Sequence, residues 1–75
     1  MAETAQEDMI SVSVNGEPRL IPQGSSITAM LRAIGIDPRK VAVERNLEVV
    51  PRSTLDSVTV SCGDSFEIVH FVGGG

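Results

Sequence analysis

The chain has 75 residues, of which 41% are hydrophobic, and a formal net charge of −4. This length allows one small domain with a thin core, because such a chain buries only about 60% of the surface that its unfolded form exposes. The negative charge and the lack of a basic cluster argue against binding to nucleic acid or to anionic membranes, which both favour concentrated Lys and Arg. No apolar run approaches the roughly 20 residues that span a bilayer.

A single cysteine and an acidic N-terminal segment bear on cofactors and compartment. One cysteine, Cys62, cannot form an internal disulfide, a cysteine-based zinc site or an iron–sulfur cluster, so we expect no bound metal or cofactor. Residues 1–8 are acidic and lack the apolar core of a secretory signal. We therefore expect a flexible N-terminal tail on a cytoplasmic protein.

The segment 9–22 predicts two strands joined by a tight turn. Apolar and polar residues alternate over 10–14, which is the period of a half-buried strand. Asn15-Gly16 follows, a strong hairpin signal because both residues tolerate positive φ. Pro22 ends the returning strand.

The period of the apolar residues changes in the segment 24–38, which predicts a helix of about ten residues. Its apolar face, spaced i, i+3, i+4 and i+7, consists of Ile27, Met30, Leu31 and Ile34. Ser25 or Ser26 can cap its start. Gly35 can supply the left-handed residue that ends it, and Pro38 prevents it from resuming.

Three extended segments follow, and they complete a β-β-α-β-β-β order. The first covers 41–46, the second is a short run ended by Pro51, and the last covers 65–72. The intervening segment predicts irregular structure, with a brief extended piece at Val58 and Val60. The first and last strands are the longest and most apolar, so we expect them at the centre of one sheet. This is an α+β domain whose helix covers one sheet face and leaves the other bare.

The final strand presents two different faces. Phe66 and Ile68 alternate with Glu67, Val69 and Phe71. If the helix covers the Phe66 and Ile68 side, Val69 and Phe71 are exposed on the bare face, where apolar side chains can mark an interface. A one-residue slip in register would exchange the two faces.

Five other polar residues have mainly structural interpretations. We expect His70 to be a strand residue near the edge, and Cys62 to be a turn residue, with mixed-disulfide formation as the alternative. Asp64 is expected to shape its turn through backbone amides. Arg45 and Arg52 are expected to be solvated, with ion pairs to an acidic partner as the alternative.

Three motifs together resemble the small sulfur carriers of thiamine biosynthesis, which are ubiquitin-like proteins with the β-grasp fold. They are "VNGE" at 14–17, "VAVERNLEVVPRS" at 41–53 and "CGDSFEIVHFVGGG" at 62–75. The resemblance implies a mixed four- to five-stranded sheet with one helix packed on one face, over residues 9–72. It also implies a flexible glycine tail at 73–75.

The resemblance further implies how that tail is used. In the family, a partner related to ubiquitin-activating enzymes adenylates the terminal carboxylate with ATP, and sulfur then replaces one oxygen to give a thiocarboxylate. Thiazole synthase takes this sulfur to build the thiazole ring. Carried over, Gly75 is the site of adenylation and thiocarboxylate formation, Gly74 completes the essential pair and Gly73 adds slack. The chain would be a co-substrate without catalytic residues, and a monomer when free.

The open sheet face beside the tail is the usual docking surface of ubiquitin-like proteins. The resemblance therefore assigns partner docking to Val69 and Phe71, and Glu67 can pair with a basic patch on the activating enzyme. The partners implied are this adenylating enzyme and thiazole synthase.

Alternatives stay open at this point. The small subunit of molybdopterin synthase, or a carrier serving cysteine or a secondary metabolite, would share the thiocarboxylate chemistry. A ubiquitin-like modifier would instead become joined through Gly75 to lysines of other proteins. A plain β-grasp binding module would have a frayed, unused tail. A ferredoxin is excluded, because its cluster needs about four cysteines.

Overall fold

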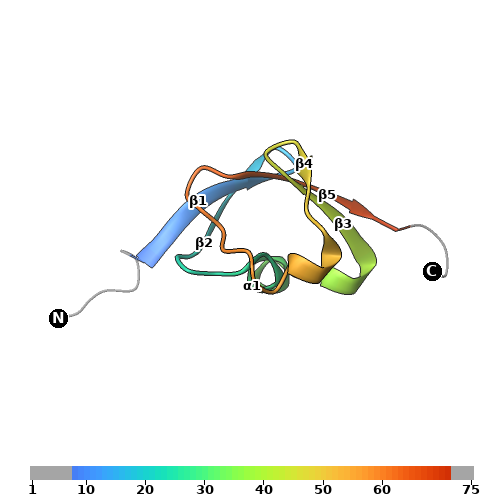
Figure 1. Cartoon of the computed structure of the whole chain (residues 1–75). Helices are drawn as coiled ribbons and strands as arrows, with labels where there is room; N and C mark the ends of the chain where they lie inside the picture. Colours follow the sequence, from blue (N-terminus) through green and yellow to red (C-terminus); the bar gives the residue numbers. More distant parts are fainter. Residues whose placement is uncertain (1–7, 72–75) are drawn as a thin grey trace.

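The computed structural model describes residues 8–71 (Figure 1). In chain order the elements are β1 (Met9–Val14), β2 (Glu17–Pro22), α1 (Ile27–Ala33), the 3-10 turn η2 (Pro38–Lys40), β3 (Val41–Arg45), β4 (Glu48–Val49), the 3-10 turn η3 (Arg52–Thr54) and β5 (Ser65–His70). Residues 1–7 and 72–75 lie outside this range, and with them most of the predicted N-terminal tail and the whole glycine tail.

The five strands form one mixed sheet in the order β2-β1-β5-β3-β4. Strands β1 and β5 are parallel, and every other neighbouring pair is antiparallel. Figure 1 shows α1 and both 3-10 turns in a second layer beneath this sheet. The predicted α+β, β-grasp architecture is confirmed, including the inner positions of the first and last strands.

The turn between β1 and β2 has two roles. Asn15 and Gly16 adopt φ values of 51° and 85°, as a two-residue hairpin turn requires. In addition, the Ile68 amide donates to Asn15 Oδ1 at 2.8 Å, and Asn15 Nδ2 donates to the Ile68 carbonyl at 3.3 Å. The Asn15 carboxamide thus pairs with β5 much as one more residue of β1 would.

Prolines limit both edges of the sheet. In a two-residue hairpin the pair flanking the loop is hydrogen-bonded, so alternate positions of β2, including Pro18 and Pro22, direct their nitrogens outward. Proline has no N–H to donate there. On the other edge, β4 has only two residues and Pro51 follows it closely. These features disfavour edge-to-edge pairing of two copies.

Helix α1 has seven residues rather than the expected ten. Ser26 is its N-cap, and the Ser26 hydroxyl oxygen accepts a hydrogen bond from the Ala29 amide at 3.0 Å. The helix stops at Ile34 because the amides of Gly35 and Ile36 return to helix carbonyls in a Schellman arrangement. Gly35 supplies the left-handed residue, with φ of 87°, as predicted.

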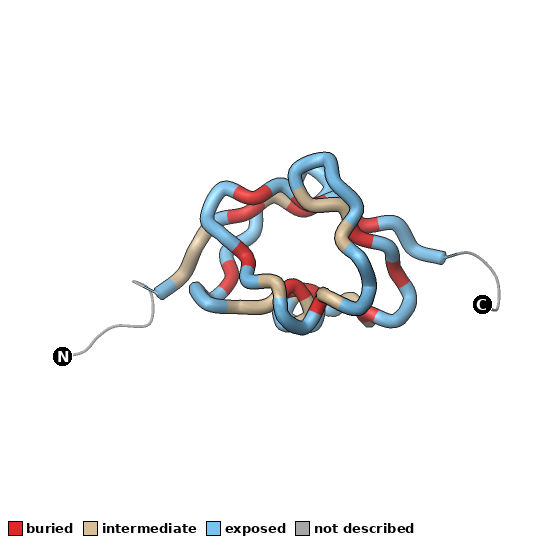
Figure 2. The backbone as a smooth tube through the Cα atoms, viewed as in Figure 1, coloured by how far each residue is buried: buried red, intermediate tan, exposed pale blue. Residues whose placement is uncertain are grey.

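Twelve buried apolar side chains form one core. Figure 2 shows buried positions in both layers. Its members are Val12, Val14, Ile21, Ile27, Met30, Leu31, Val41, Val43, Leu55, Val60, Phe66 and Ile68. Ile34 is only partly buried and packs against this core. The segment predicted as irregular supplies Leu55 and Val60, and its extended piece is a single bridge between Thr59 and Ser26.

A buried carboxylate joins the turn before β5 to the end of β3. Asp64 is 7% exposed and accepts hydrogen bonds from the Ser61 amide, from Asn46 Nδ2 and from Arg45 Nε, the last at 2.9 Å. The predicted turn-shaping role of Asp64 is confirmed. The prediction that Arg45 is solvated is wrong, because its guanidinium compensates a charge that burial would otherwise make costly.

These contacts determine the acid–base behaviour of Asp64. Burial by itself would raise the pKa of Asp64, but the hydrogen bonds from Ser61, Asn46 and Arg45 outweigh it and hold the pKa below its ordinary value. The ionised carboxylate therefore stabilises the fold above the pKa of the unfolded chain, at about pH 4. That stabilisation is lost as the pH falls through the lower, folded-state pKa.

The substitution Asp64→Asn is expected to lower the free energy of unfolding near neutral pH by roughly 1–3 kcal/mol. The difference from wild type should shrink as the pH falls through the lowered folded-state pKa of Asp64, because the wild-type chain then also loses the charge. Urea unfolding, monitored by circular dichroism at several pH values, measures this difference in the free energy of unfolding. A difference that stays constant over the acidic range would contradict this role for the carboxylate.

Candidate functional site

The structure places Val69, Phe71 and Glu67 on the sheet face that α1 does not cover. Val69 is 63% exposed and Phe71 is 53% exposed, whereas Phe66 and Ile68 are buried on the helix side. The predicted alternation of β5 is therefore confirmed, and a one-residue slip is excluded. Glu67 and Val69 lie in β5 and Phe71 directly follows it, at the end from which the chain continues to the predicted glycine tail.

Neighbouring strands extend this surface. Val69 lies opposite Ala42 of β3, and Glu67 lies opposite Glu44, which in turn lies opposite Val49 of β4. We call these residues the open-face patch: Val69, Phe71, Glu67, Ala42, Glu44 and Val49. Like charges directly opposite on a sheet repel each other. A basic group of a partner would relieve the repulsion between Glu44 and Glu67.

Sequence reasoning missed Val49, which is 72% exposed. The signal was present in the two consecutive valines Val49 and Val50. Successive side chains of a strand point to opposite faces, so only one of the two can face the core. Val50 packs against the core, which leaves Val49 on the open face.

A small apolar hollow of about 200 Å³ adjoins Phe71. Its lining comes from β3, β4, the segment after β4, Leu55 and Phe71 itself. It is smaller than the roughly 300–1,000 Å³ typical of small-molecule sites. Its size and apolar lining suit a single side chain of a protein partner.

Arg52 lines this hollow, and its side chain is bonded to other parts of the chain. Its guanidinium donates to the carbonyls of Pro38 and Val41 at 3.0 and 2.9 Å, and lies 5.3 Å from the centre of the Phe71 ring. Arg52 is exposed, as predicted, but its guanidinium is also bonded within the chain, which the sequence did not predict. Its partners lie 11 to 14 residues earlier in the chain, beyond the range of local sequence patterns.

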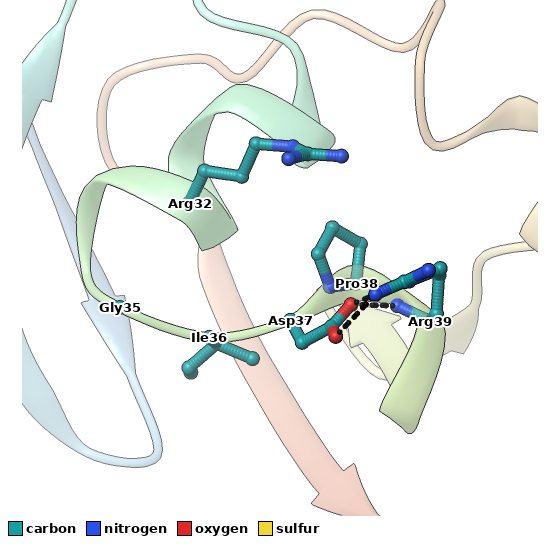
Figure 3. Close-up of a pocket in the computed structure, with 6 residues that line it drawn as sticks. All are labelled: Arg32, Gly35, Ile36, Asp37, Pro38 and Arg39. Carbon is teal, nitrogen blue, oxygen red and sulfur yellow. Dashed lines mark hydrogen bonds and ion pairs between the residues drawn. The ribbon is translucent and has the colours of Figure 1, made fainter.

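A larger hollow of about 500 Å³ lies beside the end of α1 (Figure 3). Asp37 and Arg39 form a two-pronged ion pair on one side of it, with distances of 3.2 and 3.1 Å, and Arg32 lies on the opposite side. The side-chain bond from Arg39, supported by its backbone amide, lowers the pKa of Asp37 to about 2. The carboxylate is thus occupied and ionised, and the lining offers no nucleophile beside a base.

The remaining candidate residues lie apart from one another. Cys62 is exposed in the turn before Gly63, and His70 is exposed at the end of β5, opposite Val41. Cys62 lies in a turn and His70 in a strand, as predicted, but β5 is an inner strand, so His70 lies at a strand end and not near the edge of the sheet. Within residues 8–71, no three His, Cys, Asp or Glu side chains are grouped to hold a metal ion. No helix of the described part is long and apolar enough to cross a membrane.

Comparison with known proteins gives a family match over nearly the whole domain. The family model described as "ThiS family" matches residues 12–75. The chain is 52% identical over 62 residues to a thiazole synthase of Paramagnetospirillum magneticum, which covers 83% of this chain and 19% of that protein. The chain therefore spans about a fifth of the length of this relative.

Two other similar proteins are matched over most of their own length. The sulfur carrier protein ThiS of Bacillus subtilis is 38% identical over 50 residues, which cover 67% of this chain and 76% of that protein. The crystal structure of the thiamine biosynthesis protein (ThiS) of Geobacter metallireducens superposes with a TM-score of 0.74 at 35% identity. That match covers 88% of this chain and 100% of the other.

Proposed function

The chain belongs to the ThiS family of sulfur carriers in thiamine biosynthesis, and from this premise we propose that the carboxylate of Gly75 is the group that carries the sulfur. As a member of this family it is a protein co-substrate and not an enzyme. The observation that supports the proposal most is that the family match runs through residue 75 and so includes the three terminal glycines.

The proposed chemistry has two steps at this carboxylate. First, a carboxylate oxygen attacks ATP, pyrophosphate leaves, and the chain ends in an acyl-adenylate. Second, a sulfur nucleophile attacks the activated carbonyl and displaces AMP, so that one oxygen of Gly75 is exchanged for sulfur. The activating enzyme binds the ATP and supplies positioning and electrostatic stabilisation. The carrier itself holds no cofactor, and thiazole synthase takes the sulfur in the next reaction.

The three terminal glycines have properties that suit a tail that enters the active site of a partner. Residues without side chains can pass through a narrow channel into a closed site. Three extended residues reach about 10 Å, at roughly 3.3–3.6 Å each, which takes the carboxylate of Gly75 away from the surface of the carrier. One tail can in this way visit the activating enzyme and thiazole synthase in turn.

The open-face patch is the proposed docking surface for the activating enzyme. Val69 and Phe71 supply exposed apolar area next to the tail, and Glu67 with Glu44 supplies negative charge. The patch therefore fits a partner surface that is apolar at its centre and basic at its rim. We expect the carrier to be a cytoplasmic monomer when free.

The proposal is tested by the intact mass of the purified chain after incubation with ATP, a sulfide source and the activating enzyme of a thiamine pathway. The expected result is a mass gain equal to the exchange of one oxygen for sulfur, dependent on ATP. Fragmentation should locate the gain at Gly75. No gain with an enzyme preparation that converts another sulfur carrier would overturn the proposal.

A further inference from the structure

Arg52 replaces missing strand contacts at the edge of β3. The last ladder bond between β3 and β4 runs from the Val50 amide to the Val43 carbonyl at 2.9 Å. If the pairing of β3 with β4 continued, Arg52 would lie opposite Val41, but the chain passes through Pro51 and turns into η3 at Arg52, so the ladder does not extend to the Val41 carbonyl. The Arg52 guanidinium donates to that carbonyl at 2.9 Å and bonds the Pro38 carbonyl as well.

The segment 38–41, which Arg52 bonds, also bonds the end of the last strand. We call His70 and Phe71 the tail root, because they are the last described residues before the glycine tail. The Phe71 amide donates to the Lys40 carbonyl at 2.9 Å, and Val41 lies opposite His70. Residues 38–41 are therefore bonded to Arg52 on one side and to the end of β5 on the other.

Arg52 also contacts the tail root directly. Its guanidinium carbon lies 5.3 Å from the centre of the Phe71 ring, within the range of a cation–π contact. A planar guanidinium can donate along its edges while its face lies against a ring, which an ammonium group cannot reproduce. One side chain thus restrains both the backbone and the ring of Phe71, four residues before Gly75.

We infer that Arg52 is a positioning residue for sulfur loading: it holds Phe71 and the root of the tail in the orientation that the activating enzyme recognises. The inference rests on the proposed function of Gly75. It adds to the open-face patch a residue that acts through Phe71 rather than by touching the reacting carboxylate. Loss of Arg52 should therefore weaken recognition of the carrier while leaving the chemical step nearly unchanged.

Matched substitutions of two arginines test this inference. Arg45 and Arg52 flank β4 and both bond within the chain, but Arg45 lies opposite Phe66 at the other end of β5. We would compare Arg52→Lys and Arg52→Ala with Arg45→Lys, measuring KM and kcat for thiocarboxylate formation well below the lowest melting temperature. Hydrogen exchange at the Phe71 amide reports the order of the tail root.

We expect Arg52→Ala to raise KM for the carrier roughly fivefold, with little change in kcat, and to speed exchange at Phe71. Arg52→Lys should restore only part of the affinity, and Arg45→Lys should lower the melting temperature without changing KM. An unchanged KM in Arg52→Ala, or an equal rise in Arg45→Lys, would overturn the inference. Failure of the wild-type chain to form a thiocarboxylate would instead count against the proposed function.

Discussion

Deletion of Gly74 and Gly75 is expected to abolish thiocarboxylate formation. The deletion moves the terminal carboxylate back by about 7 Å of extended chain, at roughly 3.3–3.6 Å per residue. Reacting groups must approach within bonding geometry, and a misplacement of even 1 Å can cost about a hundredfold in rate. The loss should therefore exceed about a hundredfold, measured as the rate of the mass gain in the presence of the activating enzyme and ATP.

The same deletion should leave the fold unchanged. All twelve core residues lie between Val12 and Ile68, so the melting temperature should match that of the full chain. The truncated chain should also compete with the full chain for the activating enzyme, because the open-face patch is intact. Sulfur incorporation at the new C-terminus, at a rate near that of wild type, would contradict the role assigned to Gly75.

The substitution Val69→Asp is expected to reduce kcat/KM for sulfur loading by about 30- to 150-fold, the effect of losing a contact worth about 2–3 kcal/mol at the centre of an interface. Val69 is 63% exposed, so the free carrier should tolerate the substitution. The added carboxylate would face an apolar part of the partner and would also increase the negative charge beside Glu67. Steady-state kinetics with the activating enzyme measures the effect.

Leu20→Asp is the matched control for this substitution. Leu20 is 69% exposed, and its pairing opposite Ser11 places it on the same open face. It lies on β2, however, which is separated from β5 by β1. We expect near wild-type loading for Leu20→Asp. Equal losses in both variants, or no loss in Val69→Asp, would show that the open-face patch is not the docking surface.

Much of this fold follows from local patterns in the sequence. Alternating apolar residues and Asn15-Gly16 predict the first hairpin, and the i, i+3, i+4 spacing predicts the buried face of α1. The alternation in β5 likewise identifies Val69 and Phe71 as exposed. Each of these features depends on residues that are close in the sequence, where the strand and helix periods act directly.

The features that sequence reasoning missed depend on contacts between distant residues. Asn15 bonds to Ile68, 53 residues away, and Arg45 bonds to Asp64, 19 residues away. Arg52 finds its carbonyl partners only because β4 ends early and leaves the edge of β3 open. The partners of a long polar side chain near a strand end cannot be identified until the pairing of the strands is known, and here that pairing determines which groups both arginines bond.

The two faces of the domain have different tasks. The helix side contains the core, which makes the small domain stable. The open face keeps exposed apolar side chains and a repelling pair of glutamates, which a free carrier would not need for stability. This arrangement would place the proposed docking surface next to the tail and leave the chemistry to the proposed partners.

The most direct test of the central claim is a single-turnover transfer of labelled sulfur. The chain would be converted to its thiocarboxylate with a heavy sulfur isotope, purified, and mixed with thiazole synthase and the other substrates of that enzyme. The account predicts that the label appears in the thiazole product while the chain returns to its unlabelled carboxylate mass. Thiazole formed without the label, while the chain keeps its sulfur, would contradict it.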